Sequence, residues 1–165
     1  MVNPVSSRRR SVLGGLLALP VLLLAGCSKK PEIKEEKPPP TLSMKISAGP
    51  DANRGAGGKA LPVVVRVYEL KGTGVFTSVD FFSLYDRDAA VLGADLLARD
   101  EVTLAPGQFI PLERLLKPEA AYLAVLAAFR DIDHSHWRES LRLHPGVDNQ
   151  IEIEVGPASV SIRHR

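Results

Sequence analysis

The chain has 165 residues and carries 21 Lys and Arg residues against 19 Asp and Glu residues, which gives a formal net charge of +2 at pH 7. Three of the arginines precede an apolar N-terminal segment that has no acidic residue, so the rest of the chain has 18 basic and 19 acidic residues and a net charge of −1. This balance excludes a basic surface for nucleic acid, which needs a clear surplus of Lys and Arg.

The N-terminal segment is typical of a secretory signal peptide. Arg8–Arg10 precede an apolar run, Val12–Ala25, of about 14 residues, whereas a helix that spans a bilayer needs about 20. The run ends in Leu24-Ala25-Gly26-Cys27, which contains the only cysteine of the chain and resembles the lipobox of bacterial lipoproteins. This resemblance implies that residues 1–26 are removed and that Cys27 receives a diacylglycerol and an N-acyl chain, with no other cofactor expected.

Two other interpretations of this segment stay open, namely a permanent membrane span and a cleaved signal with a coincidental cysteine. A lone thiol cannot form an intramolecular disulfide and would be a free reactive group in an oxidising compartment, a problem that lipidation removes. Arg9 and Arg10 suit either the general export route or a twin-arginine signal. Residue 28 is Ser and not Asp, which by the bacterial sorting rule favours the outer membrane.

Residues 27–40 are predicted to be a lipidated tether. From Ser28 to Pro40 the sequence has mixed charge, four prolines and one large apolar residue, so it cannot bury enough surface to fold. Such a proline-rich segment reaches at most roughly 40 Å.

From Thr41 to the C-terminus, alternating apolar residues predict a strand-rich domain, 41–165. Leu42–Ala48 and Pro62–Leu70 are predicted strands, separated by a loop rich in turn-forming residues. Ser78 is the expected cap of a short helix, in which Val79, Phe82 and Tyr85 are spaced three apart.

The second half of the domain adds six more predicted strands. Leu97–Leu104 and Phe109–Leu115 flank Ala105–Gln108, which is interpreted as a hairpin turn. Tyr122–Phe129 is almost continuously apolar and fits a central strand buried on both faces, with a helix as the open alternative. The last predicted strands are Trp137–Leu143, Gln150–Val155 and the segment around Val160 and Ile162.

This pattern predicts a mainly β fold, a two-sheet antiparallel sandwich of about eight strands with a short helical insertion. If Trp137–Leu143 pairs with Gln150–Val155, the arginines of the first strand face the glutamates of the second.

A dense group of potential metal ligands lies between two of the predicted strands. It consists of Asp131, Asp133, His134 and His136, and it motivates the alternative hypothesis of a periplasmic lipoprotein that binds a small ligand or a metal ion. Asp and His are also common in turns for solvation and capping alone, so no metal site is assigned. The chain has no nucleophile elbow, phosphate-binding glycine motif or HExxH sequence, so an enzyme is not expected.

Several ordered segments together resemble the TssJ family, the outer-membrane lipoproteins of the bacterial type VI secretion system. The segments are Asn53, Pro62–Leu70, Phe76, Asp80–Tyr85, Leu92–Leu97, Leu104–Gly107, Ala127–Asp133 and Trp137-Arg138, and they occur in this order below the lipobox.

The resemblance implies a transthyretin-like sandwich with a structural, non-enzymatic role. It implies an outer-membrane lipid anchor and a domain that faces the periplasm and binds the periplasmic C-terminal domain of TssM, with TssL joined indirectly through the complex. It also implicates the loop between the first two strands in TssM binding. In this sequence the loop consists of Gly49, Pro50, Asp51, Ala52, Asn53, Arg54, Gly55, Ala56, Gly57, Gly58, Lys59 and Ala60.

Overall fold

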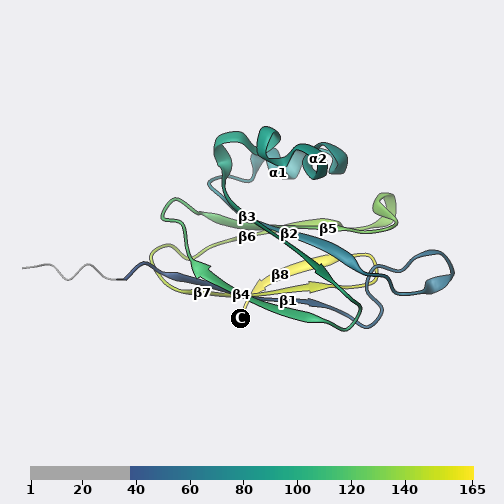
Figure 1. The fold of residues 1–165 in the computed structure, drawn as a ribbon. Coiled ribbons are helices and arrows are strands. Elements are labelled where there is room, and N and C mark those ends of the chain that lie inside the picture. The colour runs from purple at the N-terminus through teal and green to yellow at the C-terminus, as the bar shows by residue number, and fades with distance from the viewer. Residues whose placement is uncertain (1–37) are drawn as a thin grey trace, which may run out of the picture. The chain divides into compact units, whose positions relative to one another are not determined.

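Eight strands form two four-stranded sheets in the computed structural model, which describes residues 38–165 (Figure 1). The strand order is β4-β1-β7-β8 in one sheet and β3-β2-β5-β6 in the other. The strands are β1 (Thr41–Ala48), β2 (Val63–Leu70), β3 (Leu96–Leu104), β4 (Phe109–Leu115), β5 (Tyr122–Ala128), β6 (Arg138–Arg142), β7 (Asn149–Val155) and β8 (Val160–His164).

The predicted signal peptide, the lipobox with Cys27 and the tether as far as residue 37 lie outside the described residues. Within residues 38–165, no helix combines the length and the apolar character that crossing a bilayer requires.

The two sheets pack face to face because each strand places alternate side chains in the space between them. In β1, Leu42, Met44, Ile46 and Ala48 are buried, and the intervening residues are more exposed. The predicted sandwich of eight strands is confirmed. All strand pairs are antiparallel except β1 and β7, which run parallel, a pairing that the periodicity did not reveal.

The central-strand interpretation of Tyr122–Phe129 is confirmed, and the helix alternative is wrong. β5 lies between β2 and β6, and every side chain from Leu123 to Ala127 is fully buried. One face of β5 packs against the opposite sheet and the other packs under the helices, which explains why its sequence does not alternate.

Two predicted strand pairings are wrong, because in each case the two strands belong to different sheets. Ala105–Gln108 is a turn, with a 3.0 Å hydrogen bond from the Gln108 N–H to the Ala105 carbonyl, but β3 and β4 on either side of it belong to different sheets. Likewise β6 and β7 do not pair, so the predicted arginine–glutamate contacts between them do not form. Arg163 of β8 instead contacts Glu152 and Glu154, at 2.8 and 3.0 Å.

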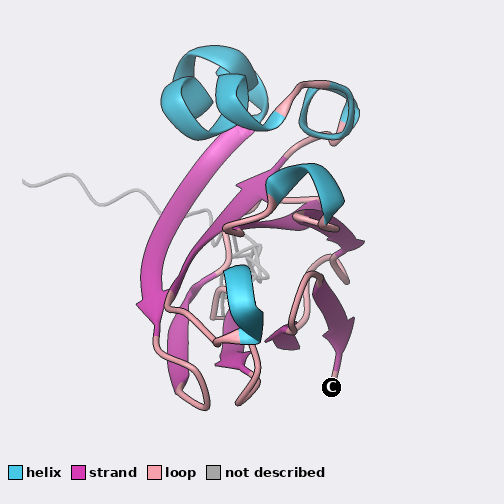
Figure 2. Cartoon of the chain, turned by 90° about the vertical axis from the view of Figure 1, so that its right-hand side faces the viewer, coloured by secondary structure: helices cyan, strands magenta, loops and turns pink. Residues whose placement is uncertain are grey.

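The helical insertion is longer than predicted and consists of two helices, α1 (Gly74–Ser78) and α2 (Phe81–Leu92), which cover the outer face of the β3-β2-β5-β6 sheet (Figures 1 and 2). Ser78 does not cap a helix, because it is the last residue of α1. The cap of α2 is Asp80, whose carboxylate accepts a 2.9 Å hydrogen bond from the Ser83 N–H.

A buried carboxylate fastens α2 to the sheet. Asp88 is 6% exposed and lies 2.8 Å from Arg99 and 3.4 Å from Arg66, and it accepts a hydrogen bond from the Tyr68 hydroxyl at 3.3 Å. Burial and the nearby Asp88 carboxylate raise the pKa of Tyr68 far above its ordinary value, so Tyr68 stays a neutral donor in this contact.

A second buried carboxylate links the two sheets at the end where the chain enters β1. Glu69 of β2 is fully buried, and its Oε1 lies 2.6 Å from the Nε of Arg114 of β4, in the opposite sheet. The other Glu69 oxygen accepts a 2.9 Å hydrogen bond from the Lys117 N–H, and Arg114 also contacts Asp100 of β3.

We predict that Arg114→Ala lowers the free energy of unfolding by about 3–5 kcal/mol at pH 7, because it leaves the Glu69 charge buried without its partner. Urea denaturation measures this loss. The matched control is Glu113→Ala, an exposed neighbour on β4, which should change stability by less than about 0.5 kcal/mol. Equal effects of the two substitutions would contradict the assigned role of the ion pair.

Candidate functional site

Four loops gather at one end of the sandwich, which we call the loop end. They connect β1 to β2 (49–62), β3 to β4 (105–108), β5 to β6 (129–137) and β7 to β8 (156–159). They meet because β1 runs parallel to β7 while β2 is antiparallel to both β3 and β5, so the odd-numbered strands all finish at this end. The 49–62 loop extends beyond the strands (Figure 1), and the view onto the loop end shows it beside the 129–137 loop (Figure 2).

Asn53 joins three of these loops. It is 4% exposed and has a positive φ of 48°, a conformation that Asn tolerates better than most residues. Its Nδ2 donates to the Pro62 carbonyl and its Oδ1 accepts from the Arg130 N–H, both at 2.7 Å. Its own N–H donates to the Gly156 carbonyl at 3.1 Å. The sequence placed Asn53 in the predicted binding loop, but the structure gives it an internal, architectural position.

The base of the 49–62 loop is fixed by further backbone hydrogen bonds. The Gly49 N–H donates to the Val155 carbonyl at 2.8 Å, and the Arg54 N–H donates to the Pro157 carbonyl at 3.0 Å. Ala52 is fully buried beside Asn53. Ala52 and Asn53 therefore hold the loop in place and do not form its surface, whereas Arg54 contributes only its backbone to the base and has an exposed side chain.

The tip of the loop is exposed and closes on itself. The Gly55 N–H donates to the Lys59 carbonyl at 2.9 Å, and the Gly58 N–H donates to the Gly55 carbonyl at 3.0 Å. Gly57 and Gly58 both have positive φ, near 79° and 78°, so the glycines are needed for this turn. The exposed members of the predicted site are Pro50, Arg54, Gly57, Gly58 and Lys59.

A depression of about 210 Å³ lies beside the loop and is lined in part by Arg54, Phe129, Asp131 and His134. The Nδ1 of His134 lies 2.9 Å from a carboxylate oxygen of Asp131. This hydrogen bond, together with the negative charges of Asp131 and Asp133, raises the pKa of His134 above its ordinary value. The loop end therefore presents both positive and negative charge around an apolar floor.

The predicted group of metal ligands is not brought together. His134 pairs with Asp131, whereas the Nε2 of His136 lies 2.9 Å from Glu139. Within residues 38–165, no three His, Cys, Asp or Glu side chains converge as the ligands of a metal ion would.

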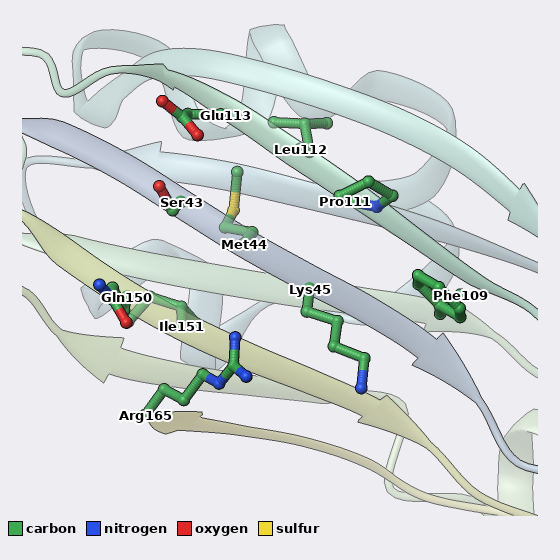
Figure 3. A pocket seen from close by; sticks show the side chains of 10 residues that line it. All are labelled: Ser43, Met44, Lys45, Phe109, Pro111, Leu112, Glu113, Gln150, Ile151 and Arg165. Atoms are coloured by element: carbon green, nitrogen blue, oxygen red, sulfur yellow. The ribbon is translucent and has the colours of Figure 1, made fainter.

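A depression of about 540 Å³ on the outer face of the β4-β1-β7-β8 sheet is an alternative site (Figure 3). Lys45 and Phe109 lie on it, with the Lys45 ammonium 5.5 Å from the centre of the Phe109 ring. It lies on the open face of a sheet, whereas small-molecule sites bury most of their ligand, and Lys45 is already near Glu152 at 3.7 Å. The loop end is the better candidate, because it combines an exposed loop with a fixed base.

We predict that Asn53→Ala lowers the free energy of unfolding by about 2–4 kcal/mol, since it leaves the Pro62 carbonyl and the Arg130 N–H without partners and adds backbone strain. Asn53→Gly removes only the side-chain hydrogen bonds and should lose less. Chemical denaturation measures both, with Lys59→Ala at the exposed tip as the control. A loss no larger than that of the control would show that Asn53 does not hold the loops.

Comparisons with known proteins identify relatives of this chain. Residues 40–158 match the sequence model of a family described as type VI secretion lipoprotein, VasD, EvfM, TssJ. No curated protein matches the sequence.

Solved structures share both the fold and part of the sequence. The T6SS lipoprotein TssJ1 from Pseudomonas aeruginosa is 34% identical with a TM-score of 0.74, and the match covers 78% of this chain and 98% of that chain. Serratia marcescens Lip, described as a membrane bound component of the Type VI Secretion System, is 29% identical with a TM-score of 0.69 and coverages of 77% and 98%. A chain of a structure described as the T6SS protein TssM C-terminal domain from EAEC is 30% identical with a TM-score of 0.61 and coverages of 74% and 97%.

Proposed function

The chain belongs to the type VI secretion lipoprotein family that includes TssJ, as its sequence segments predicted, and from this premise we propose a structural role in the membrane complex of the secretion system. In this proposal, acylated Cys27 anchors the protein in the outer membrane. The loop end binds the periplasmic C-terminal domain of TssM, and TssL joins only indirectly through TssM.

The proposal rests on one observation: the chain enters the domain at one end, and the 49–62 loop lies at the other end. The chain enters β1 at Thr41, where the Thr41 N–H donates to Asp148 just before β7. The 49–62 loop follows the far end of β1, eight residues later, which is about 26 Å at 3.3 Å per residue. A lipid anchor before Thr41 therefore leaves the loop end free to meet a partner that rises from the inner membrane.

The composition of the loop supports a contact with a protein. A tip that is exposed and bonded to itself presents backbone groups in a fixed shape, so binding requires little further ordering of the loop. Arg54 pairs with Asp51 at 2.9 Å and Lys59 is exposed in the same loop, so the loop can also select a partner by charge.

The domain can be tested without its N-terminal segment. The described residues, 38–165, belong to one compact unit, and about 78% of this chain accounts for 98% of the solved TssJ1 chain. We predict saturable binding, with micromolar affinity or better, between residues 41–165 and the periplasmic C-terminal domain of the TssM encoded in the same genome, measured by calorimetric titration.

Within that titration, Arg54→Ala combined with Lys59→Asp should weaken binding at least tenfold without changing the melting temperature, because both side chains are exposed at the tip. The control is Lys117→Ala, which removes an exposed cation at the opposite end. Failure of the wild-type domain to bind would overturn the TssM assignment. If the tip variant binds with the same affinity as the wild-type domain, the contact lies elsewhere on the domain.

A separate prediction tests the anchor. Cys27→Ala should abolish incorporation of labelled palmitate and move the protein from the outer-membrane fraction to the soluble periplasmic fraction. The reason is that the diacylglycerol and the N-acyl chain, which together make anchoring stable, are both attached to Cys27. Ser28→Ala serves as the control, since it changes the neighbouring residue and keeps the thiol. Retention of the Cys27→Ala variant in the membrane fraction would show that another feature holds the protein there.

A further inference from the structure

A groove of about 440 Å³ lies between the start of α2 and the short turn η3 (Ile132–His134), and we call it the aromatic groove. The residues that matter in it are Asp80, Phe82, Ile132, Asp133, Trp137 and Arg138. Phe82 is 63% exposed, whereas Tyr68, Phe76 and Phe129 are buried. A large aromatic side chain exposed at the rim of a groove is typical of an interaction site.

Phe82 is held by an ordered set of rings. Phe81 packs edge-on against Trp137 with ring centres 5.2 Å apart, and it stacks on Tyr85 at 5.3 Å. Phe82 in turn packs edge-on against Phe81 at 5.3 Å. Because its neighbours are fixed by the sheet and by α2, Phe82 is presented in a defined position, which lowers the entropy lost on binding.

The cation inside the groove is already engaged by the fold. Arg138 donates from Nη1 to the carbonyls of Phe76 and Val79, at 2.8 and 2.5 Å, and its guanidinium lies 4.4 Å from the centre of the Trp137 ring. Arg138 therefore caps the end of α1, and within the described residues it forms no ion pair with the carboxylates at the rim of the groove.

Those carboxylates, Asp80 and Asp133, take part in no ion pair within the described residues. Asp80 is further held in its charged form, because the hydrogen bond from Ser83 lowers its pKa. The aromatic groove thus carries the two negative charges of Asp80 and Asp133 against the one positive charge of Arg138, beside an exposed aromatic face, which complements a cation attached to an apolar segment.

The aromatic groove is continuous with the loop end through η3. Ile132 and Asp133 line the groove, whereas Asp131 and His134, on either side of them, line the depression beside the 49–62 loop. A partner that covers the loop end therefore reaches the groove without crossing an unrelated surface.

We propose that the protein that binds the loop end also places a basic and apolar segment in the aromatic groove, with a Lys or Arg side chain near Asp80 and Asp133 and an apolar side chain against Phe82. This inference rests on the proposed function and extends it, because it names a second contact and the chemistry of the partner there. It is independent of the loop tip, which shares no side chain with the groove.

The test uses the same titration with the TssM domain and three groove variants. Asp80→Asn removes the charge and keeps an oxygen that caps Ser83, so α2 should stay intact. Asp80→Asn with Asp133→Asn should weaken binding at least fivefold and reduce its dependence on salt concentration. Phe82→Ser should weaken binding at least tenfold with little change in salt dependence.

Matched controls separate the groove from general effects. Asp86→Asn removes an exposed carboxylate from another part of α2, and Phe109→Ser removes an exposed aromatic ring from the far sheet, so neither should change the affinity. Circular dichroism and melting temperature confirm that each variant is folded.

The outcomes distinguish this inference from the proposed function. If the wild-type domain binds, the tip variant weakens binding and the groove variants bind like their controls, the groove assignment is overturned while the function stands. If the wild-type domain does not bind, both fail together. If Phe82→Ser instead abolishes self-association of the domain in sedimentation, the groove accepts a second copy of this chain and the inference is overturned.

Discussion

The loop end depends on one buried amide, Asn53. The hydrophobic core accounts for the two sheets, but the loops that leave them have few apolar contacts of their own, so polar contacts must fix their positions. Asn53 supplies a donor, an acceptor and a left-handed backbone in one residue, and it thereby ties the 49–62 loop to Pro62, Arg130 and Gly156. The exposed tip and the depression beside it exist in their present form because this amide is satisfied.

The sequence predicted the strands of the fold better than it predicted which strands pair. β1, β7 and β8 were found because each buries alternate residues, and that period is visible in the chain, whereas β2 was found from its run of valines. Strand partners were not found, because an alternating pattern states which face is buried but not which strand lies alongside. The turn at 105–108 and the connection between Trp137–Leu143 and Gln150–Val155 therefore resembled hairpin turns, although both carry the chain from one sheet to the other.

The site was predicted less completely than the fold. The position of the 49–60 loop followed from its family resemblance, but the division of that loop into a buried base and an exposed tip depends on contacts with residues far along the chain, such as Arg130 and Pro157. The aromatic groove was missed for a similar reason. Phe81, Phe82 and Tyr85 were interpreted as the buried face of the helical insertion, yet only Phe81 and Tyr85 pack against the core, and Phe82 is 63% exposed.

The buried polar groups lie where hydrophobic burial alone leaves the geometry undetermined. Asn53 fixes the loops, Asp88 fixes α2 over the sheet, and Glu69 with Arg114 fixes one sheet against the other at the opposite end. The folded state loses stability if the partners of any of these buried groups are removed. Each group therefore disfavours other arrangements of the loops, helix and sheets more strongly than an apolar contact of the same size does. The internal groups thereby keep the loop tip and the aromatic groove in a constant relation to each other.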